Sequence, residues 1–422
     1  MPAAIEPDLP DPSSGEPKVS FRTILADPPV RVIMLITFTS LLGFGIVAPI
    51  LPLYARSFGV GYGAAGLLLS AFAVVRLVFD PIAGPIIDRF GERATATAGL
   101  VVLAASSVAT GLAPNFPTAL ALRALGGAGS SVLFAAMYSY LLKVVPKDRM
   151  ARTLGVFYGS FNVGFIAGGP IGGAVAQHLG LASPLFVYAA LCALAAVLYL
   201  RFVTDPAPST QELAPSDGAW TVAVSLLRSR AFVTTVVLNM SFFWVIAGGY
   251  DTLVPLFGRS VLGMSTVAIG VVLAVGVATD FLMLFPAGTV ADRLGRRALL
   301  VPALVWFAAS VAAGGLASGA LMFGVLLGLM GLGSGSVAVA PGAMLSDVVA
   351  ARNRATAVGL YRFFGDLGFI FGPLVAGYAA GSIGFRWAFV LTAVPPAVSL
   401  LLVLWTPETF RPGRSHEAGT AA

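Results

Sequence analysis

Six charged residues lie inside long apolar stretches of this chain. They are two arginine–aspartate pairs with four-residue spacing, one further arginine and one further aspartate: Arg76, Asp80, Arg362, Asp366, Arg123 and Asp280. A charge in hydrocarbon costs at least about 2.5–3.5 kcal/mol, so such residues are usually retained for a function. A carboxylate in an apolar setting can bind and release a proton, and an arginine can balance its charge. The six residues therefore indicate proton or ion handling in a low-dielectric medium.

The composition predicts that this medium is a lipid bilayer. Of the 422 residues, 58% are hydrophobic and only 10% are charged, whereas soluble domains have roughly 25% charged residues. This balance excludes a soluble enzyme, a nucleic-acid-binding domain and a disordered chain. The single cysteine, Cys192, and two distant histidines give no disulfide framework and no metal site. We find no phosphate-binding glycine loop and no nucleophile–base pair, so we expect neither an enzyme nor a resident cofactor.

Twelve stretches are long enough to cross a bilayer as helices, at about 20 residues each. They lie near 31–55, 62–87, 94–113, 117–145, 152–178, 182–203, 231–257, 264–290, 298–316, 319–349, 355–380 and 386–405. The predicted fold is an all-α membrane protein with twelve transmembrane helices in two pseudo-symmetric six-helix bundles. The predicted parts are a flexible tail (1–30), an N-terminal bundle (31–203), a linker (204–229), a C-terminal bundle (230–406) and a second tail (407–422). Within the linker, residues 220–227 are expected to form an interfacial helix.

The distribution of basic residues predicts the orientation. Of the 25 Lys and Arg residues, 19 fall on the side of the two termini, 3 fall in loops of the opposite side and 3 lie inside spans. Because cytoplasmic segments carry the excess of Lys and Arg, both termini are predicted to be cytoplasmic. The expected location is the inner (cytoplasmic) membrane, which the chain crosses many times.

The two halves of the sequence repeat each other. Residues 84–91 match 288–295, and 164–166 match 368–370, each at an offset of 204. Residues 52–57 match 255–260 at an offset of 203. A nearly constant offset in three separate spans predicts two bundles of parallel topology, related by an axis along the membrane normal.

The loop after the second span carries a charged motif with a copy after the eighth. The copies comprise Gly84, Asp88, Arg89, Gly91 and Arg93, and Gly288, Asp292, Arg293, Gly295, Arg296 and Arg297. With these motifs, residues 31–406 resemble the major facilitator superfamily, and within it the twelve-span drug:proton antiporters. The first copy departs from the family, which usually has a basic residue where Glu92 stands.

The resemblance implies a gating role for these loops. Asp88 would dock on the start of span 11 and hold the outward-open state, since a carboxylate favours the positive end of a helix dipole. The alternative is that these charges only mark the ends of cytoplasmic loops.

Two further segments resemble motifs of the same family. In span 4, Arg123 and the glycines after it are similar to a motif whose arginine is tied to proton transfer, although the glutamine usual at Gly126 is missing. In span 5, the run 168–173 is similar to an antiporter signature, with Gly168, Gly169, Pro170 and Gly173 as its key residues. Its expected role is close helix contact with a proline bend; plain glycine-rich packing is the alternative.

A depth argument predicts how four of the intramembrane charges pair. Asp80 and Arg362 each lie eight residues, about 12 Å, from the cytoplasmic end of their spans, and Arg76 and Asp366 lie about 18 Å from it. In the family fold, spans 2 and 11 pack side by side. Asp80 should therefore meet Arg362, and Arg76 should meet Asp366. We hypothesise that this network couples protonation to the conformational switch; the alternative is a purely structural ionic lock.

Asp280 occupies a different environment. By the offset of the internal repeat it corresponds to Arg76, and Asn162 corresponds to Asp366, so Asp280 has no evident cationic partner. Low dielectric favours the neutral form of such a carboxyl, which suits a proton carrier or a counter-ion for a cationic substrate. The alternative is a protonated Asp280 that is hydrogen-bonded to Asn162 as structural glue. Asp251, near the outer end of span 7, is interpreted as solvated.

Spans 1, 4, 7 and 10 line the central cavity in the family fold. The candidates for substrate contact are Phe134, Met137, Tyr138, Asn162, Asn239, Trp244 and Tyr250. Aromatic faces suit lipophilic or cationic ligands. The alternative for each aromatic residue is packing or contact with lipid.

The resulting prediction is a monomeric transporter working by alternating access. It would perform proton-coupled efflux of lipophilic molecules, cations included, driven by the proton gradient without a cofactor. Its partners would be the small-molecule substrate, protons and the bilayer, with no nucleic acid. A proton-coupled symporter or facilitator for a sugar, organic acid or siderophore is the alternative. A receptor or scaffold is disfavoured, because it has no need of gate loops in both halves.

Overall fold

The computed structural model describes residues 28–145, 147–205, 218–350 and 353–409, without the side chains of 28–30, 147–152, 154–162, 219 and 355. Within these ranges every regular element is helical. The first half contains α2 (Pro28–Val47), α3 (Leu51–Arg56), α4 (Tyr62–Gly111), α5 (Phe116–Val144), α6 (Lys147–Leu179) and α7 (Ser183–Phe202). The second half contains α8 (Ala219–Leu227), α9 (Arg230–Trp244), η1 (Val245–Leu253), α10 (Val254–Ser260), α11 (Thr266–Leu294), α12 (Arg296–Ala313), η2 (Gly314–Leu316), α13 (Ala320–Ala338), α14 (Ala340–Val348), α15 (Arg354–Ser382), α16 (Phe385–Thr392) and α17 (Val394–Trp405).

Long apolar helices dominate because lipid offers the backbone no hydrogen-bond partners, so each crossing segment must satisfy its own. Ten stretches of the described chain are long and apolar enough to cross a membrane. One of them, Tyr62–Gly111, contains two spans, since Gly91 has a non-helical φ of 79°. With the 33-residue helix α6, the described chain has twelve crossing segments. The predicted fold class is confirmed.

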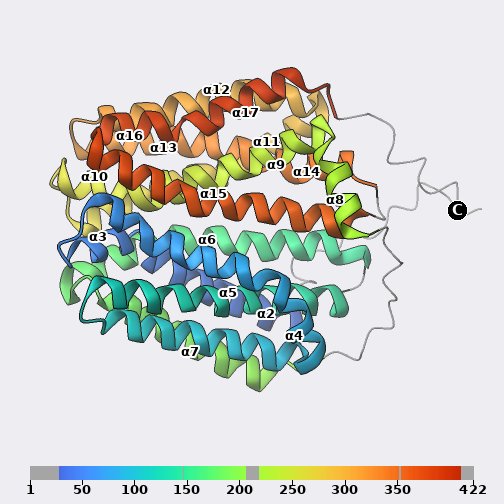
Figure 1. The fold of residues 1–422 in the computed structure, drawn as a ribbon, viewed down its shortest axis with the longest axis horizontal. Helices are drawn as coiled ribbons and strands as arrows, with labels where there is room; N and C mark the ends of the chain where they lie inside the picture. Colours follow the sequence, from blue (N-terminus) through green and yellow to red (C-terminus); the bar gives the residue numbers. More distant parts are fainter. Residues whose placement is uncertain (1–27, 146, 206–217, 351–352, 410–422) are drawn as a thin grey trace, which may run out of the picture.

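The helices run along one common direction, with the short helices α3 and α10 at one end and α8 at the other (Figure 1). We name these ends the α10 side and the α8 side. The described chain enters the bundle at α2 and leaves it after α17 on the α8 side, so the predicted orientation corresponds to an α8 side that faces the cytoplasm.

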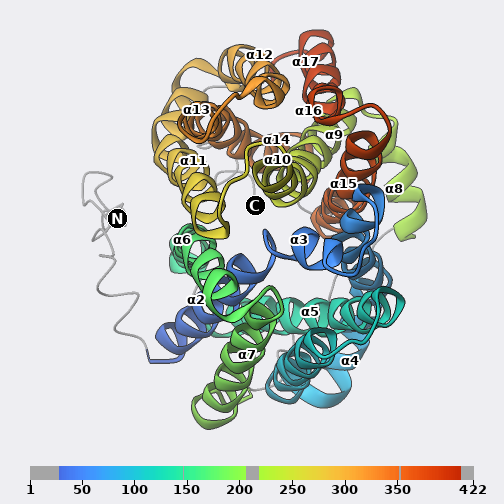
Figure 2. The same ribbon diagram turned by 90° about the vertical axis from the view of Figure 1, so that its left-hand side faces the viewer.

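Two groups of helices are evident from the α10 side, one formed by α2–α7 and one by α9–α17 (Figure 2). They meet along two seams. At one seam α6 packs against α11, and at the other α4 packs against α15. Each seam joins one helix from each half, as the family resemblance implies for spans 2 and 11 and the internal repeat then implies for spans 5 and 8.

The loops between spans 2 and 3 and between spans 8 and 9 are shorter than expected. Gly91 and Gly295, which are equivalent in the internal repeat, turn the chain with φ of 79° and 99°. Only glycine adopts such angles without strain, so one residue suffices for each turn. The helix has resumed at Glu92, whereas the sequence predicted a start at residue 94. Residues 220–227 form a helix, as predicted, within α8.

The seventh span contains a π-helical segment, η1, that hydropathy did not reveal. Gly248 in η1 packs directly on the backbone of Gly372 in α15, where an added Cβ would lie 2.7 Å from the Gly372 oxygen. Such close approach requires glycine on both helices. Asp251, also in η1, is 6% exposed, so its interpretation as a solvated carboxylate is wrong. Tight packing of η1 against its neighbours covers it.

Candidate functional site

Four intramembrane charges meet at the seam between α4 and α15. Arg76 forms an ion pair with Asp366, and Arg362 Nη2 lies 3.9 Å from Asp80 Oδ2. These are the two pairings that the depth argument predicts. The Asp366 side chain is 10% exposed and that of Arg362 is 47% exposed, so the pair nearer the membrane centre is the more buried.

The network is built across the two halves and not along each helix. Among the described residues, no ion pair joins Arg76 to Asp80 or Arg362 to Asp366, although both pairs have the four-residue spacing. Asp80 also accepts a hydrogen bond from Ser131 Oγ of α5, at 2.5 Å. Each carboxylate therefore has a cation from the opposite bundle, so changing one charge changes the contact between the bundles.

Asp280 lies on α11, the helix that contributes the second half's side of the other seam, and is 9% exposed. Its carboxylate accepts a hydrogen bond from Ser334 of α13. Asp80 and Asp280 thus each accept a hydrogen bond from a serine of their own half, Ser131 in span 4 and Ser334 in span 10. Within the described residues Asp280 forms no ion pair, which leaves it free to carry a proton. The side chain of Asn162, its predicted neighbour, lies outside the described residues.

Arg123 is fully buried, with 0% exposure, in the middle of the first bundle. Its guanidinium carbon lies 4.4 Å from the ring centre of Phe72 and 5.9 Å from that of Tyr188. None of its three nitrogens has a hydrogen-bond partner among the described residues. The aromatic faces partly compensate the charge, because the negative face of a ring attracts a cation. A buried charge without hydrogen bonds costs stability, which indicates a functional reason for keeping it.

The gate loops are held by carboxylates that follow the last span of each half. Asp205 Oδ1 accepts from the backbone N–H of Arg93 at 2.7 Å. Glu408 accepts from the backbone N–H groups of Arg296 and Arg297 at 3.1 and 2.9 Å. Both carboxylates sit at the start of a helix, where free N–H groups and the helix dipole favour a negative charge.

The Glu92 position explains why the first gate motif departs from the family pattern. Glu92, with a side chain 3% exposed, pairs with Lys143 at the end of α5 and accepts from Ser139 Oγ at 2.8 Å. In the second half Arg296 Nε lies 3.3 Å from Asp347 Oδ2. In the internal repeat Glu92 corresponds to Arg296 and Lys143 corresponds to Asp347. The two ion pairs therefore lie at equivalent positions with opposite charges. Sequence reasoning missed these pairs, although applying the repeat offset to Glu92 and Lys143 would have found them.

The other gate residues lie at the surface of the α8 side. Asp292 forms an ion pair of 2.6 Å with Arg296. Asp88, Arg89 and Arg293 are exposed, and the described residues provide no hydrogen bond or ion pair between Asp88 and α15. Docking of Asp88 on span 11 stays a prediction for another state. An added Cβ at Gly84 or Gly288 would meet nothing within 4 Å, so close packing does not explain these glycines.

The glycine-rich run of α6 contacts two different helices. An added Cβ on Gly168 would lie 2.5 Å from the carbonyl carbon of Gly45 in α2. Gly169 and Gly173 face the other bundle, where Cβ atoms would collide with the carbonyl oxygens of Gly270 and Thr266 of α11. Pro170 lies inside the helix between these contacts. The run therefore forms the seam between α6 and α11 as well as packing within its own bundle.

The candidate substrate residues have different surroundings. Met137 and Tyr250 are buried, at 1% and 4% exposure, and Tyr250 packs on Gly276 of α11. Asn239 donates to the Tyr361 carbonyl of α15 at 2.8 Å and so braces its own bundle. Phe134, Tyr138 and Trp244 are half-buried. The indole N–H of Trp244 is buried without a hydrogen-bond partner among the described residues.

Several close contacts between the two halves lie on the α10 side. Ser70 Oγ donates to the Ile370 carbonyl at 2.7 Å, and Thr266 Oγ1 donates to the Gly173 carbonyl at 2.8 Å. Gly66 lies against the backbone of Pro373. The two halves therefore make close contacts along both seams on the α10 side.

The fold and these motifs define a membrane transporter of two pseudo-symmetric bundles. The sequence matches the family model described as Major Facilitator Superfamily over residues 33–283 and 268–421. The chain belongs to this superfamily. It is a multi-pass membrane transporter and not an enzyme.

The chain is similar to two drug-resistance proteins. It is 26% identical to the quinolone resistance protein NorA of Staphylococcus aureus (strain Mu50 / ATCC 700699) over 224 residues, which cover 52% of this chain and 56% of that protein. It is 24% identical to multidrug resistance protein 2 of Bacillus subtilis (strain 168) over 376 residues, which cover 87% and 92%. The match to NorA thus spans about half the length of that relative.

Solved transporter structures share the fold. A bacterial homolog of the human lysosomal transporter Spinster, in an inward-facing and occupied conformation, has a TM-score of 0.77 at 15% identity, covering 89% of this chain and 95% of that one. The nucleoside transporter NupG has a TM-score of 0.74 at 13% identity, covering 90% and 100%. At these identities the likeness concerns the fold alone.

Proposed function

We propose that this protein is a proton-coupled antiporter that exports lipophilic small molecules, cations included, across the inner membrane by alternating access. The observation that carries the proposal is the pairing of Asp366 with Arg76 across the seam between the bundles. Protonation of Asp366 would remove the counter-charge of Arg76 and weaken the contact that holds the bundles together. Proton binding and the conformational switch would then be coupled through one ion pair.

Asp280 supplies a second protonation site in the same proposal. It is buried on α11 with Ser334 of α13 as its hydrogen-bond partner. A carboxylate without a cation can take either a proton or a cationic substrate, and competition between the two for one site is one way to couple their movement in antiport. The similarity to the two drug-resistance proteins supports lipophilic substrates.

The proposed orientation places the α8 side in the cytoplasm, in agreement with the basic-residue count. The α10 side then faces outward, and the proton gradient supplies the energy without a resident cofactor. We expect the protein to work as a monomer, because each seam is completed within one chain.

Proton flux in proteoliposomes tests the proposal. Vesicles contain a trapped pH-sensitive dye, a pH gradient is imposed, and the cations ethidium and tetraphenylphosphonium or the neutral dye Nile red are added. We expect proton movement on addition of a substrate, and its loss in Asp366→Asn and in Asp280→Asn. Asp11→Asn, outside the spans, is the matched control and should behave as wild type.

Two results would count against the proposal. Folded wild-type protein that moves no protons with any lipophile would favour the metabolite symporter or facilitator. Near-normal pH-driven transport in Asp366→Asn would leave the four charges as a structural lock.

A further inference from the structure

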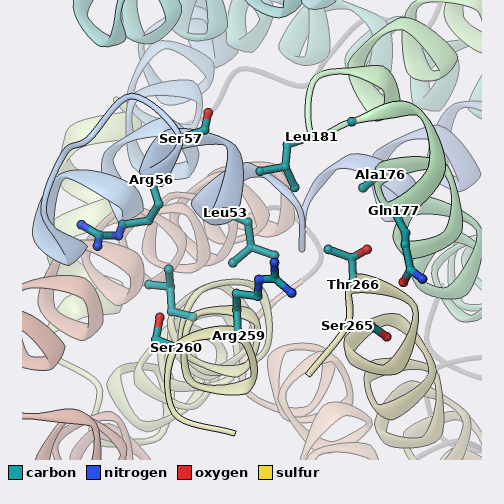
Figure 3. A pocket seen from close by; sticks show the side chains of 12 residues that line it. Leu53, Arg56, Ser57, Ala176, Gln177, Leu181, Arg259, Ser260, Ser265 and Thr266 are labelled. Atoms are coloured by element: carbon teal, nitrogen blue, oxygen red, sulfur yellow. The ribbon is translucent and has the colours of Figure 1, made fainter. Parts of the chain in front are cut away.

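A cavity of about 620 Å³ opens on the α10 side, where α3, α6, α10 and α11 meet (Figure 3). Its volume lies within the range of about 300–1,000 Å³ found for small-molecule sites. The twelve lining residues include two arginines, four hydroxyl side chains and one glutamine, and none of the twelve is acidic. This cavity lies apart from the four-charge network, and none of the predicted substrate residues lines it.

The two arginines, Arg56 and Arg259, occupy equivalent positions in the internal repeat. The structure uses them differently. Arg56 donates to the Val60 carbonyl and lies over the Tyr62 ring, 4.4 Å from its centre. In Figure 3 its guanidinium points toward the rim and away from Arg259.

Arg259 points into the cavity, with its guanidinium between Leu53 and Thr266 (Figure 3). One of its N–H groups donates to the Met264 carbonyl at 3.2 Å. A guanidinium has five N–H donors in a fixed fork, so several remain for a ligand. The hydrogen bond to the Met264 carbonyl therefore uses only part of the donor capacity of the Arg259 guanidinium.

The surroundings of Arg259 add to its positive potential. The 29-residue helix α11 begins at the cavity wall, and its positive dipole end lies beside Thr266. The connecting segments 57–61, 112–115, 180–182, 261–265, 317–319 and 383–384 of this side contain no aspartate or glutamate. Asp251, which precedes Arg259 in the same span, is buried and forms no ion pair among the described residues.

The cavity also has an apolar wall. Leu53, Leu181 and Leu256 line it. We propose that this cavity binds small organic anions, with the carboxylate or sulfonate group paired to Arg259 and the apolar body against the leucines. Arginine suits this role because its fork matches both oxygens of such a group.

Saturation-transfer NMR on the protein in phosphatidylcholine nanodiscs tests the proposal with two probes of matched size, benzoate and benzylammonium. The cavity is open to water, so binding should be weak, in the millimolar range. We expect benzoate to bind and benzylammonium not to bind. Arg259→Gln should weaken benzoate binding about tenfold, and added salt should weaken it in the wild type.

Arg386→Gln is the matched control, because Arg386 is an exposed arginine of the same side that does not line the cavity. It should leave binding unchanged. Arg259→Lys retains the charge without the fork and should give an intermediate affinity; it decides the question if Arg259→Gln does not fold. Undiminished binding in both Arg259 variants, an equal loss in Arg386→Gln, or equal binding of benzylammonium would overturn the proposal. The measurement uses no proton gradient, so its result is independent of the proposed antiport.

Discussion

Lys143 and Asp347 occupy equivalent positions of the internal repeat, at the α8-side ends of spans 4 and 10, and carry opposite charges. Each pairs with the residue after the glycine turn of its own half, Lys143 with Glu92 and Asp347 with Arg296. The repeat has thus kept the ion pair and exchanged its signs. The contact itself, between a gate loop and the neighbouring span, is therefore what both halves share.

The opposite charges of the two ion pairs lead to a prediction about the free energy of unfolding. Lys143→Met should lower the free energy of unfolding by about 1–3 kcal/mol, because it leaves the carboxylate of Glu92 buried without its cation. The double variant Glu92→Arg with Lys143→Asp copies the charges of the second half and should recover most of the loss. The unfolding temperature in detergent measures both effects, and Arg201→Met at the exposed end of α7 serves as the control. A double variant no more stable than Lys143→Met would contradict the exchange.

The two pairs of the four-charge network should differ in strength. Asp366→Asn leaves Arg76, whose side chain is 21% exposed, without its counter-charge, whereas Asp80→Asn leaves Arg362, which is 47% exposed and can be rehydrated. We therefore expect Asp366→Asn to lower the unfolding temperature more than Asp80→Asn. Adding Arg76→Gln to Asp366→Asn should recover part of the loss. Equal decreases in unfolding temperature for Asp366→Asn and Asp80→Asn would show that burial does not determine which ion pair contributes more to stability.

Hydropathy predicted the twelve spans, and charge position predicted the contact of Arg76 with Asp366 once the family resemblance placed spans 2 and 11 side by side. Both depend on distances along a helix, which the sequence determines through a rise of about 1.5 Å per residue. The internal repeat then placed equivalent spans at equivalent seams.

The contacts that sequence reasoning missed depend on helix rotation and on closure of the bundle. The bond from Ser334 to Asp280 requires a particular face of α13 to meet α11, which a uniformly apolar sequence does not specify. Asp205 reaches Arg93 only because span 6 ends beside the start of span 3. Asp251 is buried within the π-helical segment η1, which hydropathy did not reveal.

Arg123 should show opposite effects on stability and transport. Arg123→Met keeps much of the side-chain volume and removes a buried charge that has no hydrogen bonds among the described residues, so the unfolding temperature should stay equal or rise. Substrate-driven proton movement should be lost, because in the family motif that this segment resembles the arginine is tied to proton transfer. A fall in unfolding temperature by more than a few degrees would instead mean that the stacking on Phe72 makes Arg123 a structural residue.

Gly173 should control how tightly the α10 side closes. A methyl group there would collide with the carbonyl of Thr266, so Gly173→Ala should push α6 away from α11 and favour opening on this side. The backbone N–H of Val267 lies 3.4 Å from Gln177 Oε1, so cysteines at positions 177 and 267, in a Cys192→Ser background, report the separation. We expect a clearly lower cross-linking yield in Gly173→Ala and no change in Gly342→Ala, where a Cβ meets nothing within 4 Å. A full cross-linking yield in Gly173→Ala would mean that the helices absorb the methyl group without separating, and that the close glycine contact does not set the closed state.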